Sequence, residues 1–157
     1  MENYAEQFVN EQQVIIQLAV ALLLGALTGL QRGWAAREQK PGERVAGMRT
    51  YALVGLLGGI AALLSLKVTA WVLPTTLLAV CIAAVMAYRV RMLQMRDYSI
   101  TGIIGLLLTF CFGAVAVAVD ITIAATAAVI TTIILDNKNE IHSALNRLQE
   151  HELDAAL

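Results

Sequence analysis

Residues 98–135 read YSITGIIGLLLTFCFGAVAVAVDITIAATAAVITTIIL, and Asp120 is the only charged residue among them. A helix that crosses a bilayer needs about 20 apolar residues, so one helix over this whole stretch would be far longer than a single crossing. We therefore predict two antiparallel helices, at 98–119 and 121–135, joined by a tight reversal at 117–121. The second is short, and the alternative is a re-entrant or interfacial segment that leaves the C-terminus on the other side.

The rest of the chain extends the same pattern towards the N-terminus. Three further charge-free windows of spanning length occur at 12–31, 50–66 and 68–88. The 157 residues are 59% hydrophobic and 15% charged, against roughly 45–50% and about 25% in soluble domains. The sequence predicts an all-α, polytopic transmembrane bundle of about five spans. No Lys or Arg precedes the first window, so we expect an anchor and not a cleavable signal peptide.

Basic residues fix the expected orientation, because Lys and Arg concentrate in cytoplasmic loops. Of the 11 Lys and Arg residues, Lys67 alone lies in a loop on one side of the predicted membrane. The others follow the first window, the third window or the last one. With five spans, the N-terminus lies outside and both basic loops and the C-terminal tail lie in the cytoplasm. Trp34, Tyr51 and Trp71 lie near span ends, where an aromatic belt is expected.

The composition changes at residue 136. We divide the chain into a transmembrane domain, 1–135, and a tail, 136–157. In the tail, Ile141, Leu145 and Leu148 recur at helical spacing, which predicts a cytoplasmic amphipathic helix on the membrane surface or on a partner.

Polar residues gather where the first window ends and the second begins. Ionisable residues at mid-depth in a bilayer usually mark function, and these windows contain none. The loop brings the two window ends together, so we predict a functional polar cluster of Gln31, Arg32, Arg49 and Thr50, with Glu38 or Glu43 as a further member. The alternative is that these arginines only anchor the loop on the cytoplasmic side.

Pairs of glycines four residues apart occur in the first two windows, at Gly25 and Gly29 and at Gly55 and Gly59. This spacing lets helix backbones approach closely. We predict that the glycines pack helices within one bundle, with a homodimer interface as the alternative. Asp120 is expected to be a solvated turn residue, and an ion contact is the weaker alternative.

Several functions are disfavoured. The net charge is −1, and no basic cluster is interleaved with aromatics, so nucleic acid is not an expected partner. Walker-type, HExxH, CxxC and nucleophile-elbow motifs are absent, so we expect neither an enzyme nor a metal or other cofactor. Cys81 and Cys111 lie in apolar runs and are read as buried thiols.

The runs LLLGALTGLQRGW and GERVAGMRTYALVGLLGGIAALLS resemble the signature of the MgtC/SapB family of bacterial inner-membrane proteins. The resemblance covers about residues 14–66 and rests on Gly25, Gly29, Leu30, Arg32, Ala46, Gly47, Arg49, Thr50, Leu53, Val54 and Gly55. The later stretch GAVAVAVDITIAATAAVITTIIL is similar to the subgroup in which a second membrane domain of unknown function follows. The resemblance therefore leaves open whether the chain is a fragment or a stand-alone member.

This sequence departs from the family pattern in two ways that bear on function. Gln31 stands where the family usually has glutamate, and the soluble C-terminal domain of the virulence-linked members is missing. The roles of those members, in survival under magnesium limitation and in inhibition of the F-type ATP synthase, are therefore implied only by analogy. We expect a homodimeric, non-enzymatic regulator of another membrane protein, linked to magnesium homeostasis. A transporter, or transporter half, for a divalent cation or small solute is the alternative.

Overall fold

The computed structural model describes residues 2–35, 46–95 and 100–136, which form five helices and no strand. In chain order the helices are α1 Glu2–Ala35, α2 Met48–Lys67, α3 Val72–Met95, α4 Thr101–Ala118 and α5 Ile121–Asp136. The predicted all-α class is confirmed. Of the predicted tail, only Asp136 falls within the described residues.

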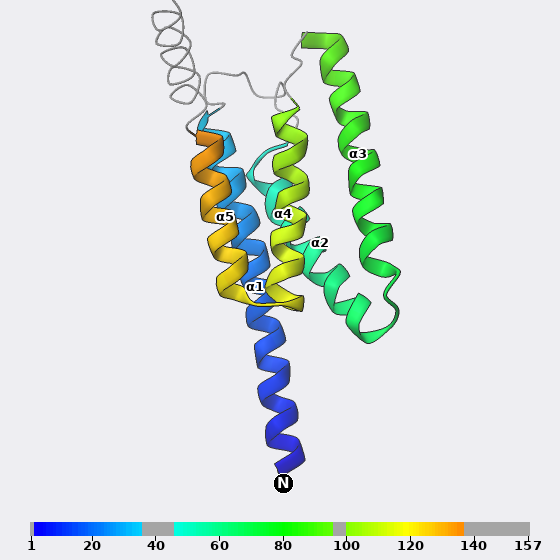
Figure 1. Cartoon of the computed structure of the whole chain (residues 1–157), viewed down its shortest axis with the longest axis vertical. Coiled ribbons are helices and arrows are strands. Elements are labelled where there is room, and N and C mark those ends of the chain that lie inside the picture. Colours follow the sequence, from blue (N-terminus) through cyan, green and yellow to red (C-terminus); the bar gives the residue numbers. More distant parts are fainter. Residues whose placement is uncertain (1, 36–45, 96–99, 137–157) are drawn as a thin grey trace, which may run out of the picture.

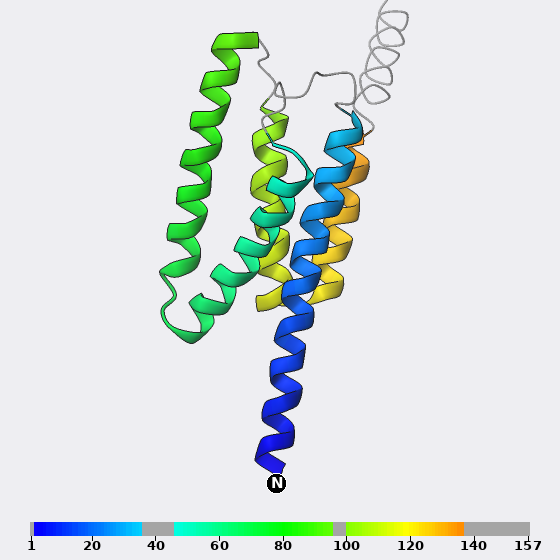
Figure 2. The same cartoon turned by 180° about the vertical axis from the view of Figure 1, so that it is seen from behind.

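Within the described ranges, four helices are long and apolar enough to cross a membrane. Their apolar segments are Glu11–Trp34, Met48–Lys67, Val72–Val90 and Thr101–Ala118, and a shorter apolar helix runs over Ile121–Leu135. Helix α5 runs alongside α1 and α4 and not across them (Figures 1 and 2). This orientation favours a crossing segment over the interfacial alternative for residues 121–135.

Helix α2 packs against both α1 and α4, and α4 contacts each of the other four helices (Figures 1 and 2). Helix α5 packs on the far side of α4 and against α1. Helix α3 stands at the edge, joined to α2 by a short turn, and its only buried residues among those described are Val80 and Ala84. Four helices therefore form the packed body, and α3 is peripheral.

Glycine lets α2 sit this close to its neighbours. A methyl group added at Gly25 of α1 would lie 2.9 Å from the Cα of Ala52, and one at Gly58 of α2 would lie 2.9 Å from the carbonyl carbon of Phe110. Separations below about 3 Å are well inside van der Waals contact. The two faces of α2 thus touch the backbones of α1 and α4 directly.

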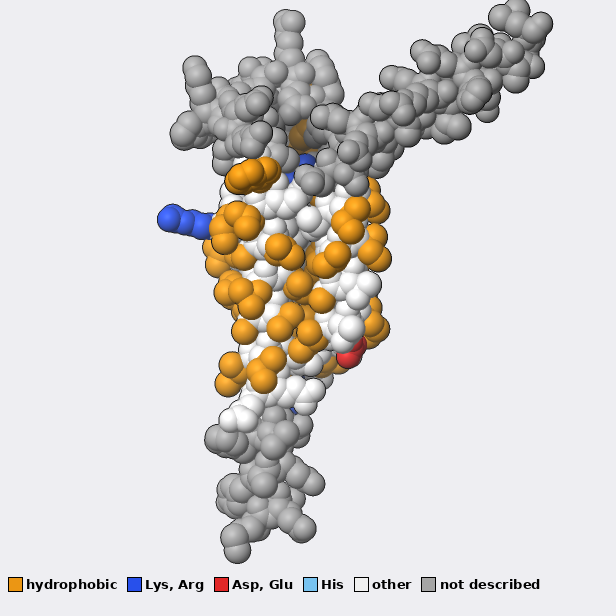
Figure 3. All heavy atoms as spheres, turned by 90° about the vertical axis from the view of Figure 1, so that its left-hand side faces the viewer, with side chains coloured by type: hydrophobic (Ala, Val, Ile, Leu, Met, Phe, Trp, Pro, Cys, Tyr) orange, Lys and Arg blue, Asp and Glu red, His pale blue; other side chains and the backbone are white. Residues whose placement is uncertain are grey.

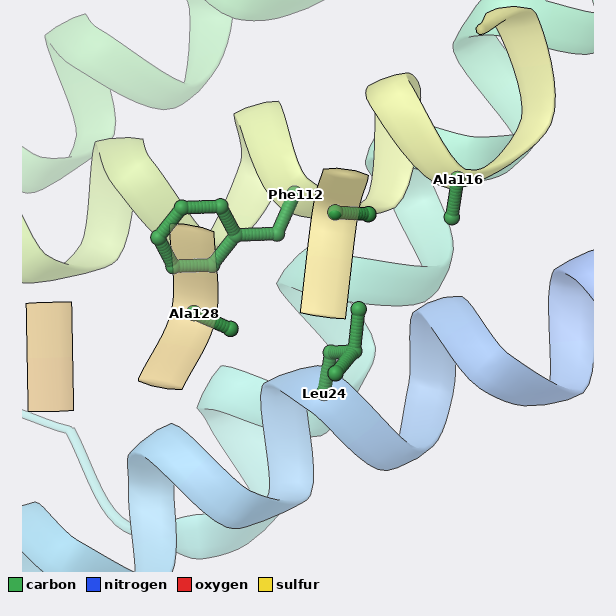
Figure 4. Close-up of a cluster of buried hydrophobic side chains, with 5 residues drawn as sticks. Leu24, Phe112, Ala116 and Ala128 are labelled. Carbon is green, nitrogen blue, oxygen red and sulfur yellow. The ribbon is translucent and has the colours of Figure 1, made fainter. Parts of the chain in front are cut away.

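The apolar core between α1, α4 and α5 is built from one large ring and several small residues. Leu24 of α1 and Phe112 of α4 meet Ala124 and Ala128 of α5, with Ala116 beside them (Figure 4). Alanines on α5 leave the space that the Phe112 ring fills. A second buried ring, Phe110, packs towards α2 and α3.

The predicted reversal near Asp120 is present, although the sequence there offers neither Gly nor Pro. Asp120 Oδ1 accepts hydrogen bonds from the backbone N–H groups of Thr122 at 2.7 Å and Ile123 at 3.2 Å. This is an N-cap, which satisfies amide donors left open at the start of α5. An Asp directly before an apolar run is a sequence signal for such a cap, but the turn was predicted from span length alone.

Helix α1 is longer than the window that predicts it. Its 34 residues, at about 1.5 Å each, make it about 51 Å long, against a bilayer core of about 30 Å. The N-terminal part of α1 projects beyond the other helices (Figure 1). The polar residues before position 12 continue the helix because Glu, Gln and Ala all have good helix propensity.

The surface of the bundle is mostly apolar. Large side chains exposed on it include Leu23 of α1, Ile82 and Met86 of α3, and Ile133 of α5. Figure 3 shows hydrophobic side chains spread over one face, with only isolated charged side chains on the part that is described. Such a surface is expected to face lipid or another membrane protein.

Candidate functional site

The candidate site lies at the end of the bundle where α1 ends and where α2 and α4 begin; we call it the Arg32 end. Arg32 is in the last turn of α1, and its side chain crosses to α4. There its Nη2 donates a hydrogen bond to the backbone carbonyl of Thr101. The first helix is thus tied to the first turn of the fourth, 69 residues further along the chain.

Tyr51 makes the second connection at this end. Its side chain is 3% exposed, and its hydroxyl donates a 3.2 Å hydrogen bond to the carbonyl of Gly102. The hydroxyl also lies beside the Arg32 guanidinium. Two donors, one from α1 and one from α2, therefore bind consecutive carbonyls in the first turn of α4.

Glycine makes room for these side chains. A methyl group at Gly105 would lie 3.1 Å from Arg32 Nη2, 3.3 Å from its Nε and 3.5 Å from the Tyr51 hydroxyl. A methyl group at Gly29 would lie 2.8 Å from the Tyr51 Cβ. The guanidinium therefore lies against α4 at Gly105, and the Tyr51 side chain starts directly beside α1 at Gly29.

The charge of Arg32 has no acidic partner among the described side chains. Those side chains include two carboxylates: Glu11 begins the apolar segment of α1, at the other end from Arg32, and Asp120 lies in the turn between α4 and α5. The Arg32 Nε is buried and has no hydrogen-bond acceptor among the described atoms. No group of three or more metal-ligating side chains occurs in the described part of the chain.

The structure separates the four polar residues that the sequence grouped together. Arg32 and Gln31 are partly buried, whereas Arg49 and Thr50, in the first turn of α2, are exposed. Arg32 therefore faces the bundle and Arg49 faces away from it. The two glutamates expected nearby, Glu38 and Glu43, lie outside the described residues.

Sequence reasoning placed Tyr51 in the aromatic belt, and this assignment is wrong. Tyr51 begins the buried face of α2 that continues through Gly55 and Gly58. The signal was available in the sequence, because Tyr51, Gly55 and Gly58 follow the spacing of one helix face.

The four glycines expected at helix contacts lie along the α1–α2 interface. A methyl group at Gly55 would lie 3.2 Å from the Cα of Gly25, and one at Gly59 would lie 3.1 Å from the Cβ of Ala21. A methyl group at Gly29 would lie 2.7 Å from the Cα of Met48. These contacts are within one chain.

Asp120 lies at the other end, in the α4–α5 turn, and is exposed. The backbone N–H groups of Ile123 and Thr122 hold the pKa of its carboxyl below the usual value. The carboxylate is thus engaged in capping α5. Cys81 of α3 and Cys111 of α4 are free thiols and are partly buried.

A packed helical body, an apolar surface and, among the described side chains, charged groups near the ends of the apolar segments define a multi-pass membrane protein. The family to which it belongs follows from a direct comparison. The MgtC family model matches residues 18–144, so the chain belongs to the MgtC family. The match confirms the family predicted from residues 14–66. No curated protein and no solved structure matches the chain.

Proposed function

We propose that this MgtC-family chain is a non-enzymatic regulator that binds another membrane protein, in a process linked to magnesium homeostasis. The observation that carries the proposal is the opposite placement of Arg32 and Arg49. Arg32 is engaged inside the bundle with Thr101, whereas Arg49 is exposed on the first turn of α2. A rigid bundle that presents a cation beside the membrane suits contact with a partner protein.

The close contacts between helices also favour a regulator over a transporter. The backbones of α2 and α4 meet at Gly58 and Gly113, which leaves no space between these helices there. Buried or partly buried threonines in the helices donate to carbonyls of their own helices, as Thr28, Thr109 and Thr132 do. Magnesium requires several convergent oxygen ligands in near-octahedral geometry, and this packing supplies no such convergence.

The proposed location is the bacterial inner membrane, with the N-terminus outside and the C-terminus in the cytoplasm. The helix ends support this orientation. Arg32, Arg49 and Arg89 lie at one end of the bundle and Lys67 at the other, as expected if the Arg32 end faces the cytoplasm.

We also propose a homodimer. The glycine pairs of α1 and α2 already contact other helices of the same chain, at Gly25, Gly29, Gly55 and Gly59. A dimer would therefore use outward faces, such as the exposed side of α3.

Purification from native membranes tests the regulator proposal. The tagged chain should carry one membrane protein at a fixed molar ratio in two different detergents, measured by quantitative mass spectrometry. Arg49→Ala should lose that partner while the chain still inserts and expresses normally, and Arg37→Ala should retain it. A chain that carries no protein at a fixed ratio, or equal loss in both variants, would contradict the proposal.

A further inference from the structure

The guanidinium of Arg32 carries a charge that the described residues do not balance. Its Nη2 is bound to a neutral carbonyl, its Nε is buried without an acceptor among the described atoms, and the tyrosine hydroxyl beside it is also neutral. A partly buried charge is stable when it is paired and costly when it is not. The position is also unfavourable for a lone cation, because Arg32 lies against the positive end of the α4 dipole.

From this arrangement we propose that the Arg32 end binds an anionic phosphate group. Arg32 is partly buried and therefore still partly accessible. A guanidinium is planar and presents five donors, so it can hold phosphate while one donor stays on Thr101. The Tyr51 hydroxyl lies beside it and can exchange its bond to the Gly102 carbonyl for a bond to a phosphate oxygen.

The first turn of α4, to which both side chains bind, is open on its outer side. A methyl group added at Gly102 would meet nothing within 4 Å, although Gly102 is the residue whose carbonyl accepts the Tyr51 hydroxyl. Because the apolar segment of α1 ends at Trp34, Arg32 lies at the level where lipid headgroups are expected. The phosphate can therefore come from an anionic lipid or from solution. This inference does not depend on the proposed regulator function.

Thermal unfolding of the full chain in a neutral detergent, followed by tryptophan fluorescence, tests the site. Three ligands are titrated: short-chain phosphatidylglycerol, short-chain phosphatidylcholine and inorganic phosphate. A ligand that binds only the folded state raises the Tm with its concentration. The variants are Arg32→Gln, Arg32→Lys and Tyr51→Phe, and Arg89→Gln is the matched control because Arg89 is an exposed cation at the same end of the bundle.

We expect phosphatidylglycerol to raise the Tm of the wild type and of Arg89→Gln, with affinity about tenfold lower in Arg32→Gln. Arg32→Lys keeps the charge but loses the planar fork of donors, and Tyr51→Phe loses one donor. The affinity of both variants should therefore fall between that of the wild type and that of Arg32→Gln. An equal shift with inorganic phosphate would identify free phosphate as the source, and a shift with phosphatidylglycerol alone would identify the lipid.

Three results would overturn the proposal. The first is that Arg32→Gln responds to phosphatidylglycerol and phosphate as the wild type does. The second is an equal shift with phosphatidylcholine, which would show a general effect of lipid. The third is that no ligand shifts the wild-type Tm, which would show that the charge is already balanced within the chain.

Discussion

At the scale of single residues, the contact of Tyr51 with α4 is the most specific feature of the Arg32 end. Tyr51→Phe removes the hydroxyl that binds the Gly102 carbonyl and keeps the buried ring. We expect a loss of about 0.5–1.5 kcal/mol in unfolding free energy, measured by SDS titration of helical circular dichroism in micelles. Tyr88→Phe on α3 is the control, and an equal loss there would show that the hydrogen bond is not the cause.

Asp120 gives a prediction about pH. Hydrogen bonds from Ile123 and Thr122 lower its pKa in the folded state, so its contribution to stability is fully present above the unfolded value of about 3.9. That contribution is lost as the pH falls through the lower folded value. Asp120→Asn keeps the cap and should lack this acid-dependent loss, whereas Asp120→Ala should lower the Tm at neutral pH. If all three proteins unfold alike from pH 3 to pH 7, the cap does not stabilise α5.

At the scale of the helices, the backbone contact between α2 and α4 should tolerate no added methyl group. A Cβ at Gly113 would lie 2.8 Å from the carbonyl carbon of Gly55 and 3.1 Å from the amide nitrogen of Gly59. Gly113→Ala should therefore destabilise the bundle by about 1–3 kcal/mol or more. Gly102→Ala on the same helix has open space and should be neutral or slightly stabilising. Equal effects of the two substitutions in an SDS titration would contradict this packing.

The helices could be predicted from sequence because charge interrupts apolar sequence at each end of a span. The same reasoning predicted a reversal near Asp120 but could not explain it, since the explanation lies in the hydrogen bonds of a cap. The hydrogen bond between Arg32 and Thr101 could not be predicted either, because the two residues are 69 positions apart and no local sequence pattern connects them. Arg32 and Arg49 looked equivalent in the sequence, and only the orientation of two helices distinguishes them.

At the scale of the whole molecule, the orientation in the membrane can be checked by cysteine-accessibility labelling of whole cells. Single cysteines near Glu6 and at Lys67, in a variant that lacks Cys81 and Cys111, should react with an impermeant reagent from outside. Cysteines at Lys40, Arg91 and His142 should react only after the membrane is opened. Labelling of position 142 from outside would mean that α5 does not cross the membrane.

The central claim is that this bundle is closed to ions and acts on another protein. Its most direct test is magnesium flux into liposomes that contain the purified 157-residue chain and a trapped magnesium-sensitive dye. We expect no flux above that of protein-free liposomes at any imposed gradient, because the described spans offer no carboxylate at mid-depth and an unpaired buried charge is costly. Flux that saturates with magnesium concentration and is lost in Asp120→Ala would contradict the claim and identify a transporter.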